Sequence, residues 1–400
     1  MRIALVAPRT ESGEERQAFF RLAGELAGAG AECLLFAGGG DEKGTEKYAA
    51  FHAVLARQLV PVTVFLRKET DKLRIFFVSS RQSVPYAAAV AATIGKLAAA
   101  GCRPDLLHLF SAADAVTALL CRQYLRLPYI YSIRRLRETK QSRADFAGLG
   151  IQLPPGCPAA GEYLYTEQLA AACARYLVDE TGDVRWWKEF FCSFSGQYVA
   201  GKPYADTRFW SEQASLGEAR RRKKAELLGT ENGVVVAAAG RSELPPRTEG
   251  VVCLPEPASL AERRELFATA DFYLMTHECK DMQRLAQAMA AGCLPLVPAG
   301  GAAECLLLAG GGEGEQFWLS FRQEDWPEVL AMAAARLHLG PRQMLAARQK
   351  AQNYACRHFS YTAAAALYLS IYRESAPVRL PFVTEDPGPP VAAVPGEILS

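Results

Sequence analysis

Short apolar runs alternate with stretches of helical periodicity from the first residues onward. Arg2–Ala7 is a β-prone apolar run with the length of a buried strand. Glu14–Ala29 then carries Phe19, Leu22 and Leu26 at helical spacing and ends among glycines. The same reasoning predicts a helix between Tyr86 and Ala100 and further strands at Cys33–Ala37, Val62–Leu66, Arg74–Val78, Leu106–Leu109 and Tyr129–Ile133. Strands that alternate with helices indicate a parallel sheet covered on both faces.

A second block with the same alternation begins at Gly233. It predicts strands at Val234–Ala238, Val251–Leu254, Phe272–Met275, Leu294–Val297 and Phe317–Phe321. It predicts helices at Leu260–Ala268, Asp281–Ala291, Trp326–Leu337 and Arg342–Arg357, and a last helix at Tyr361–Tyr372. The fold class is therefore α/β with two Rossmann-like lobes, and such sheets bind ligands beyond the carboxyl ends of their strands.

We place the boundary between the lobes in the irregular stretch Gly196–Tyr204. The predicted organisation is an N-terminal lobe over 1–195, a C-terminal lobe over 196–357, a crossover helix over 358–375 and a tail over 376–400. The tail is rich in proline and has too little apolar content to order itself, so we expect it to be flexible.

Charge and cysteine usage exclude several classes of function. A net charge of +2 creates no field that calls for nucleic acid or a membrane surface. The dense basic run Arg220–Lys224 lies in a polar helical stretch, Glu218–Leu228, and we interpret it as a solvated helix face. The 11 cysteines lack the spacing of a zinc site, and reduced thiols fit a cytoplasmic protein.

No segment of the sequence has the pattern of a membrane span or a secretion signal. The long uncharged run Leu285–Ala303 is interrupted by Gly292, Pro295 and Pro298, which is typical of helix, strand and loop. The apolar N-terminal run stops at Pro8 without a cleavage-site pattern.

Several short motifs occur in a characteristic order along the chain. They are Arg103–His108, Leu125–Ile133, Leu149–Leu153 with Tyr163–Tyr176, Ala205–Trp210, Ala239–Arg241, Ala268–Met275, Ala286–Val297 and His358–Tyr361. These motifs and their order resemble those of the glycogen and starch synthases, which are GT-B glycosyltransferases. The resemblance implies two Rossmann-like lobes and a final helix that returns to the first. It also implies retaining transfer of glucose from ADP- or UDP-glucose to a glucan, with the nucleotide sugar as substrate and no cofactor.

The family binds the diphosphate of the donor with an early glycine loop and with two cations. Gly13 is the one glycine that remains in the stretch corresponding to this loop, Arg9–Glu15. The surrounding Glu11, Glu14 and Glu15 oppose anion binding and favour an acidic helix start instead. Arg241 matches the first cation of the second lobe. The lysine that the family places after it is missing, so Arg241 is the principal candidate phosphate ligand.

Before the Ala-Met-x-x-Gly helix the family places two glutamates, or a glutamate and a polar residue, eight positions apart, which hold the ribose and support the transferred sugar; this motif is poorly retained. In register, the two positions fall on Cys279 and Gln287, and Glu278 is one residue away from the first. The resemblance thus implies Glu278 as a catalytic candidate and Gln287 as a donor-binding candidate. In the first lobe it implies His108 as a catalytic candidate, although a lone histidine ending an apolar strand also suits a hydrogen-bonded core position.

Two functions remain open at this stage. One is a divergent retaining glucosyltransferase; the other is a non-catalytic relative that binds a glycan or a protein partner, or regulates a true synthase. The interval between Arg241 and Ala270 has room for only one strand and one helix, so we expect a shortened second lobe. That loss, together with the missing lysine and acid pair, favours the non-catalytic interpretation, whereas the order of motifs describes the ancestry.

Overall fold

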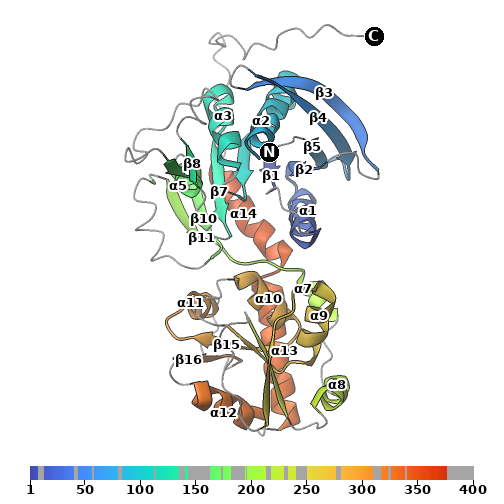
Figure 1. Ribbon diagram of the computed structural model, residues 1–400, viewed down its shortest axis with the longest axis vertical. Coiled ribbons are helices and arrows are strands. Elements are labelled where there is room, and N and C mark those ends of the chain that lie inside the picture. The colour runs from blue at the N-terminus through green and yellow to red at the C-terminus, as the bar shows by residue number, and fades with distance from the viewer. Residues whose placement is uncertain are drawn as a thin grey trace. The chain divides into compact units, whose positions relative to one another are not determined.

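The structure is a computed structural model in which the chain forms two compact units (Figure 1). It describes residues 1–7, 13–39, 44–55, 58–79, 83–111, 114–134, 140–142, 163–172, 174–181, 194, 196–212, 218–228, 233–239, 250–275, 281–309, 317–322, 326–337 and 340–375. The first unit comprises Met1–Val178, Lys188–Val199 and Tyr368–Ser400, and the second comprises Asp179–Trp187 and Ala200–Leu367.

A nine-stranded sheet forms the centre of the first unit, with the strand order β11-β10-β7-β6-β1-β2-β5-β4-β3. The strands are β1 (Arg2–Val6), β2 (Glu32–Gly38), β3 (Glu46–Leu55), β4 (Gln58–Lys68), β5 (Leu73–Ser79), β6 (Leu106–Leu109), β7 (Tyr129–Ile133), β10 (Tyr176–Asp179) and β11 (Gln197–Ala200). A separate antiparallel pair consists of β8 (Lys140–Ser142) and β9 (Tyr163–Tyr165). The buried apolar strands β1, β2, β5, β6 and β7 are the predicted ones, with ends shifted by a few residues at most.

The prediction of an all-parallel sheet is wrong at one edge. The pairs from β2 through β1 and β6 to β7 are parallel, but β3, β4 and β5 pair in antiparallel fashion. No helix separates these three strands in the chain, and a short connection reverses the direction of a strand. The sequence analysis also missed β3 and placed the irregular domain boundary over β11, a short and largely exposed edge strand.

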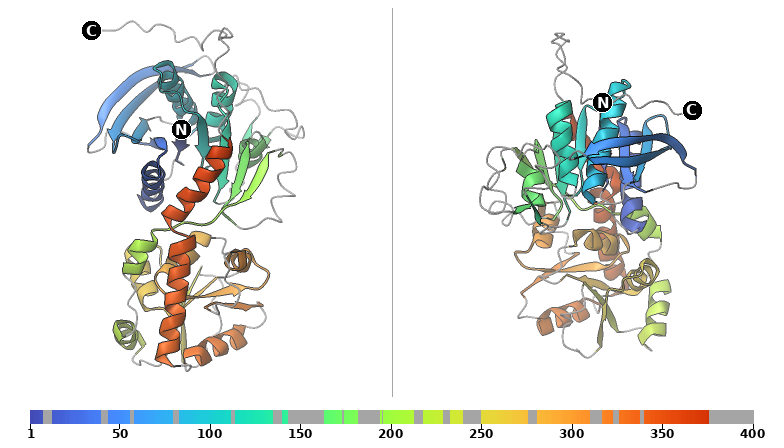
Figure 2. Two further views of the ribbon diagram at one scale, coloured as in Figure 1. Left: turned by 180° about the vertical axis from the view of Figure 1, so that it is seen from behind. Right: turned by 45° about the horizontal axis from the view of Figure 1, so that its top comes forward.

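Helices cover both faces of this sheet (Figures 1 and 2). On one face lie α2 (Ser83–Ala99) and α3 (Ala115–Leu125), joined by a hydrogen bond from the Thr117 hydroxyl to the Ala87 carbonyl (2.8 Å). On the other lie α1 (Gly13–Gly28) and the second half of α14 (Tyr361–Ser375). The short α5 (Thr166–Ala172) precedes β10. The last helix therefore returns to the first lobe, as predicted, because its residues from Tyr368 onward belong to that unit.

The second unit has a five-stranded parallel sheet with the order β13-β12-β14-β15-β16. Its strands are β12 (Val234–Ala238), β13 (Val251–Pro255), β14 (Phe272–Leu274), β15 (Leu294–Pro298) and β16 (Leu319–Phe321). Its helices are α7 (Thr207–Glu212), α8 (Glu218–Leu228), α9 (Leu260–Thr269), α10 (Met282–Ala290), α11 (Ala302–Ala309), α12 (Trp326–Leu337), α13 (Pro341–His358) and the first half of α14. Every strand and helix predicted for this block is confirmed, whereas α7 and α11 were missed.

Local sequence explains where the central elements of this unit begin and end. The Ser259 hydroxyl accepts a hydrogen bond from the Glu262 amide and caps α9, and the Asp281 carboxylate does the same for α10 through the Arg284 amide. Gly292, with φ of 82°, makes the tight turn from α10 into β15, a conformation that favours glycine. Between β12 and β14 the described residues contain one strand and one helix, as expected.

The basic run of α8 is not a uniformly solvated face, which corrects the sequence-based interpretation. Arg221, Arg222 and Lys223 are exposed, but Arg220 and Lys224 are buried. Residues four apart share one face of a helix, and here that face packs against the sheet. The Lys224 ammonium lies 2.9 Å from the Asp271 carboxylate, and Arg348 of α13 pairs with the same carboxylate.

Arg220 is held by main-chain carbonyls instead of by an acid. Its guanidinium donates to the carbonyls of Phe267, Thr269 and Ala270 at the end of α9, and to that of Ala291 at the end of α10. Helix C-termini carry unpaired carbonyls and partial negative charge, so they stabilise a cation. Burial, with a contribution from Arg348, lowers the pKa of Arg220 to about 10, which keeps it charged at neutral pH.

Among the described residues, no helix is both long and apolar enough to cross a membrane.

Candidate functional site

The strand orders define one switch point in each sheet, where connections leave neighbouring strands in opposite directions. In the first unit it lies between β1 and β6, which pair in parallel from Ile3 and Leu106 onward. In the second it lies between β12 and β14, which pair from Val236 and Phe272 onward. Open α/β sheets bind ligands at the carboxyl ends of the strands at such points. These two places are therefore where the candidate site residues are expected to lie.

Gly13 is the first residue of α1, the helix that follows β1. The structure thus puts it at the start of a helix on the switch-point side of the first sheet, as a phosphate-binding loop would require. Glu11 lies outside the described residues. The assignment of Gly13 as a phosphate ligand stays a prediction.

His108 lies in β6 and is completely buried. Its Nδ1 atom is 2.6 Å from the Tyr372 hydroxyl, and its Nε2 atom is 2.8 Å from the Ser132 hydroxyl. The Tyr368 hydroxyl lies 3.0 Å from Ser132, so two tyrosines of α14 share this network. Burial holds the pKa of His108 well below its usual range, and the ring is therefore neutral. With both ring nitrogens engaged in the core, this conformation offers a substrate no nitrogen of His108.

Phe110 and Arg134, which follow the strands β6 and β7, pack on Phe19 of α1. The Phe110 ring lies 4.9 Å from the ring of Phe19 and 4.0 Å from that of His108. The Arg134 guanidinium lies 5.0 Å from the centre of the Phe19 ring, within the range of a cation–π interaction. An apolar and aromatic cluster thus occupies the end of β6.

Of the three candidates in the second lobe, the structure describes Gln287 alone. Arg241 and Glu278 lie outside the described residues, as does Cys279. Gln287 is buried on α10, and its Oε1 atom accepts a hydrogen bond of 3.0 Å from Arg284. The predicted residues are thus not seen as one constellation, and their site roles stay predictions.

A charged cluster that the sequence analysis missed occupies the carboxyl end of the second sheet. Glu256 directly follows β13, and its Oε1 atom lies 2.8 Å from Nε of Arg263 and 3.2 Å from Nε of Arg284. Its Oε2 atom accepts a hydrogen bond of 3.1 Å from the Tyr273 hydroxyl. The Asp281 carboxylate lies 3.7 Å from Arg284 on the outer side. We call Glu256, Arg263, Arg284 and Tyr273 the Glu256 cluster.

Most of the Glu256 cluster is shielded from water. The side chain of Glu256 is 11% exposed and that of Arg263 3%, whereas that of Arg284 is 21% exposed. Burial raises the pKa of the Glu256 carboxyl, and the two arginines and the Tyr273 hydroxyl oppose that shift. The only sequence signal for the cluster is an acid placed at a strand end, because its arginines come from two different helices.

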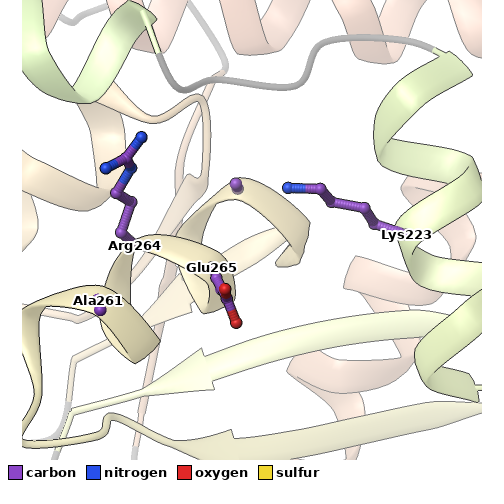
Figure 3. A pocket seen from close by; sticks show the side chains of 5 residues that line it. Lys223, Ala261, Arg264 and Glu265 are labelled. Carbon is purple, nitrogen blue, oxygen red and sulfur yellow. The ribbon is translucent and has the colours of Figure 1, made fainter.

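A surface pocket on α8 and α9 contains none of the predicted site residues (Figure 3). It is lined by Lys223, Ala261, Arg264, Glu265 and Ala268. Figure 3 shows the Lys223 side chain extending from α8 toward α9, which carries Arg264 and Glu265. The pocket is open and its charges are on exposed or half-buried side chains, so it has little to hold a ligand.

No family model matches the chain, and no curated protein matches it. Solved structures do. The catalytic domain of starch synthase IV from Arabidopsis thaliana, bound to ADP and acarbose, matches with a TM-score of 0.71 at 12% identity, over 94% of this chain and 99% of that chain. Sucrose-phosphate synthase from Thermosynechococcus elongatus matches with a TM-score of 0.57 at 12% identity, over 94% and 98%.

The Anabaena protein HepE, in complex with UDP and glucose, matches with a TM-score of 0.54 at 12% identity, over 93% of this chain and 99% of that chain. Identities this low carry information on fold and not on activity. The alternating elements, the two switch points and the returning last helix agree with these similarities: the chain has the two-lobed GT-B fold of the glycosyltransferases.

Proposed function

We propose that this chain is a non-catalytic, cytoplasmic relative of the retaining nucleotide-sugar glucosyltransferases, which binds a glycan or a protein partner without transferring sugar. The main support is the state of two described cations at the carboxyl end of the second sheet, Arg263 and Arg284. Donor cleavage requires positive charge directed at the departing diphosphate. Arg263 and Arg284 instead direct theirs at Glu256.

Two further observations support the loss of activity. His108, the candidate of the first lobe, is part of a buried network with α14 and not of an open site. Gln287, the donor-binding candidate of the second lobe, is buried, and its side-chain oxygen accepts a hydrogen bond from Arg284.

A second candidate is a divergent retaining glucosyltransferase that uses ADP- or UDP-glucose. Its support is the likeness to solved structures that contain ADP and acarbose, or UDP and glucose. In that case Arg241 would bind the diphosphate and Glu278 would support the transferred sugar, with a glucan or other glycan as acceptor.

Calorimetry with the purified full chain separates the two functions. We expect no binding of ADP-glucose or UDP-glucose at a dissociation constant of about 1 mM or tighter, and no release of ADP or UDP when glycogen is added. Retarded migration of the protein in gels containing glycogen would identify the glycan-binding role. Binding heat with nucleotide release, abolished by Arg241→Ala but not by Arg221→Ala on the exposed face of α8, would instead establish the enzyme.

A further inference from the structure

We propose that Arg263, Arg284 and the Tyr273 hydroxyl form an anion-binding site of the phosphate and pyrophosphate class, which the chain fills with its own Glu256 carboxylate. The inference deepens the proposed function and rests on it, because it gives a physical cause for the absence of donor binding. It concerns residues other than those that the sequence comparison implied.

The geometry of the cluster is that of a bound anion. One carboxylate oxygen lies at ion-pair distances of 2.8 and 3.2 Å from guanidinium Nε atoms of α9 and α10, and the other accepts a hydrogen bond from the Tyr273 hydroxyl of β14 at 3.1 Å. Three secondary-structure elements thus place two cations and one hydroxyl donor around one carboxylate. Guanidinium groups bind carboxylate and phosphate oxygens in the same way, so the donor set would accept either.

The placement of the cluster favours a ligand site over an ordinary surface ion pair. It lies where β13 and β14 end, on either side of β12, at the carboxyl edge of the sheet. The backbone amide of Glu256 donates to the Ala238 carbonyl (2.9 Å), which fixes the carboxylate next to the end of β12. Arg284 lies in the first turn of α10, whose N-terminus adds partial positive charge.

Among the described charges of the cluster and its neighbour Asp281, two arginines face two carboxylates. Removing the charge of Glu256 leaves one more positive than negative charge among these four groups, and an external anion is then favoured to restore neutrality. The carboxylate is part of the chain, so its local concentration exceeds that of any free anion, and it excludes competitors in the natural protein.

Replacing Glu256 by glutamine tests this directly, because glutamine keeps the shape and a hydrogen-bond acceptor but removes the charge. The probe is inorganic pyrophosphate, titrated by calorimetry and by its effect on the melting temperature. We expect E256Q to bind pyrophosphate at least tenfold more tightly than the natural chain. The matched controls are E265Q, which makes the same change of charge on α9 away from the cluster (Figure 3), and Glu256→Asp, which keeps the charge; neither should gain binding. The double variant E256Q with Arg284→Ala should lose the gain.

Equal pyrophosphate affinity of E256Q, E265Q and the natural chain would overturn the inference, and so would a gain in E265Q alone. Should E256Q prove too unstable to purify, refolding from urea with and without pyrophosphate gives the same information, since an anion that fills the site stabilises the fold. Recovery only with pyrophosphate supports the inference, and no effect of pyrophosphate refutes it. Donor turnover by the natural chain would refute the proposed function, whereas a silent natural chain with an unresponsive E256Q would refute only the role of Glu256.

Discussion

Replacing Asp271 by asparagine is expected to lower the free energy of unfolding of the second lobe by about 3–5 kcal/mol. Asp271 is completely buried at the start of β14. Its Oδ2 atom accepts hydrogen bonds from the Lys224 ammonium (2.9 Å) and the Val235 amide (3.0 Å), and its Oδ1 atom pairs with Arg348. It is therefore the acid that holds α8, α13 and the sheet together.

The effect is large because the variant leaves cations without a counter-charge. Lys224 and Arg348 are both largely buried, and a buried charge that loses its partner keeps its full desolvation cost. The asparagine amide also presents a donor where the carboxylate only accepted. Adding Lys224→Met to the Asp271→Asn variant should recover part of the lost free energy of unfolding, since it removes one of the two buried cations without a counter-charge.

Urea unfolding followed by circular dichroism measures these changes. The matched control is Asp281→Asn, a partly exposed acid that caps α10, because asparagine is as good an N-cap as aspartate; we expect a change within about 0.5 kcal/mol. A loss of less than about 1 kcal/mol in the free energy of unfolding for Asp271→Asn would show that solvent or a rearrangement compensates the charges of Lys224 and Arg348. These two buried cations would then contribute little to the stability of the fold.

The first lobe is expected to lose up to about 2 kcal/mol of stability between pH 7 and pH 5 through His108 alone. Burial depresses the pKa of His108 in the folded state, whereas the unfolded chain protonates near the ordinary value of 6.5. Below pH 6.5, His108 is therefore protonated in the unfolded state but stays neutral in the folded state. The stability that the neutral ring of His108 contributes is fully present above pH 6.5 and is lost as the pH falls below this value.

Comparison with His108→Gln isolates this effect. The variant is less stable at every pH, because the Tyr372 and Ser132 hydroxyls lose their partners, but the part of the pH dependence due to His108 disappears. The buried Asp114 carboxyl, whose pKa is raised by burial, contributes in the opposite direction, and this contribution cancels in the difference between the two proteins. Urea titrations at pH 5, 6 and 7 provide the free energies. If the free energy of unfolding changed equally with pH in the natural chain and in His108→Gln, this would contradict a buried His108 that stays neutral.

The sequence analysis predicted the second lobe better than the first for a physical reason. In the second lobe, buried apolar strands alternate with amphipathic helices, so most elements have a local sequence pattern that predicts them. In the first lobe, β3 carries a mixed run of alanines and polar residues, and β11 has only four residues, most of them exposed. Neither has an apolar periodicity, since edge strands bury less of their surface.

Sequence alone also predicted a kind of site, but it could not indicate what the side chains of that site contact. The motif order identified the fold, and the missing lysine and acids predicted a weakened donor site. The run Arg220–Lys224, however, was expected to be solvated, whereas Arg220 and Lys224 are buried against partners far away in the chain. Whether a charge is solvated depends on such distant partners, which no local pattern contains.

What the sequence by itself determined is the order of most strands and helices, because apolar periodicity is a local property of neighbouring residues; the order of its motifs predicted the GT-B fold. Only the tertiary structure decided that His108 binds the last helix, 264 residues away, and that Glu256 lies between two arginines of separate helices. The physical reason is that desolvation and charge pairing depend on which distant groups the fold brings within a few ångströms.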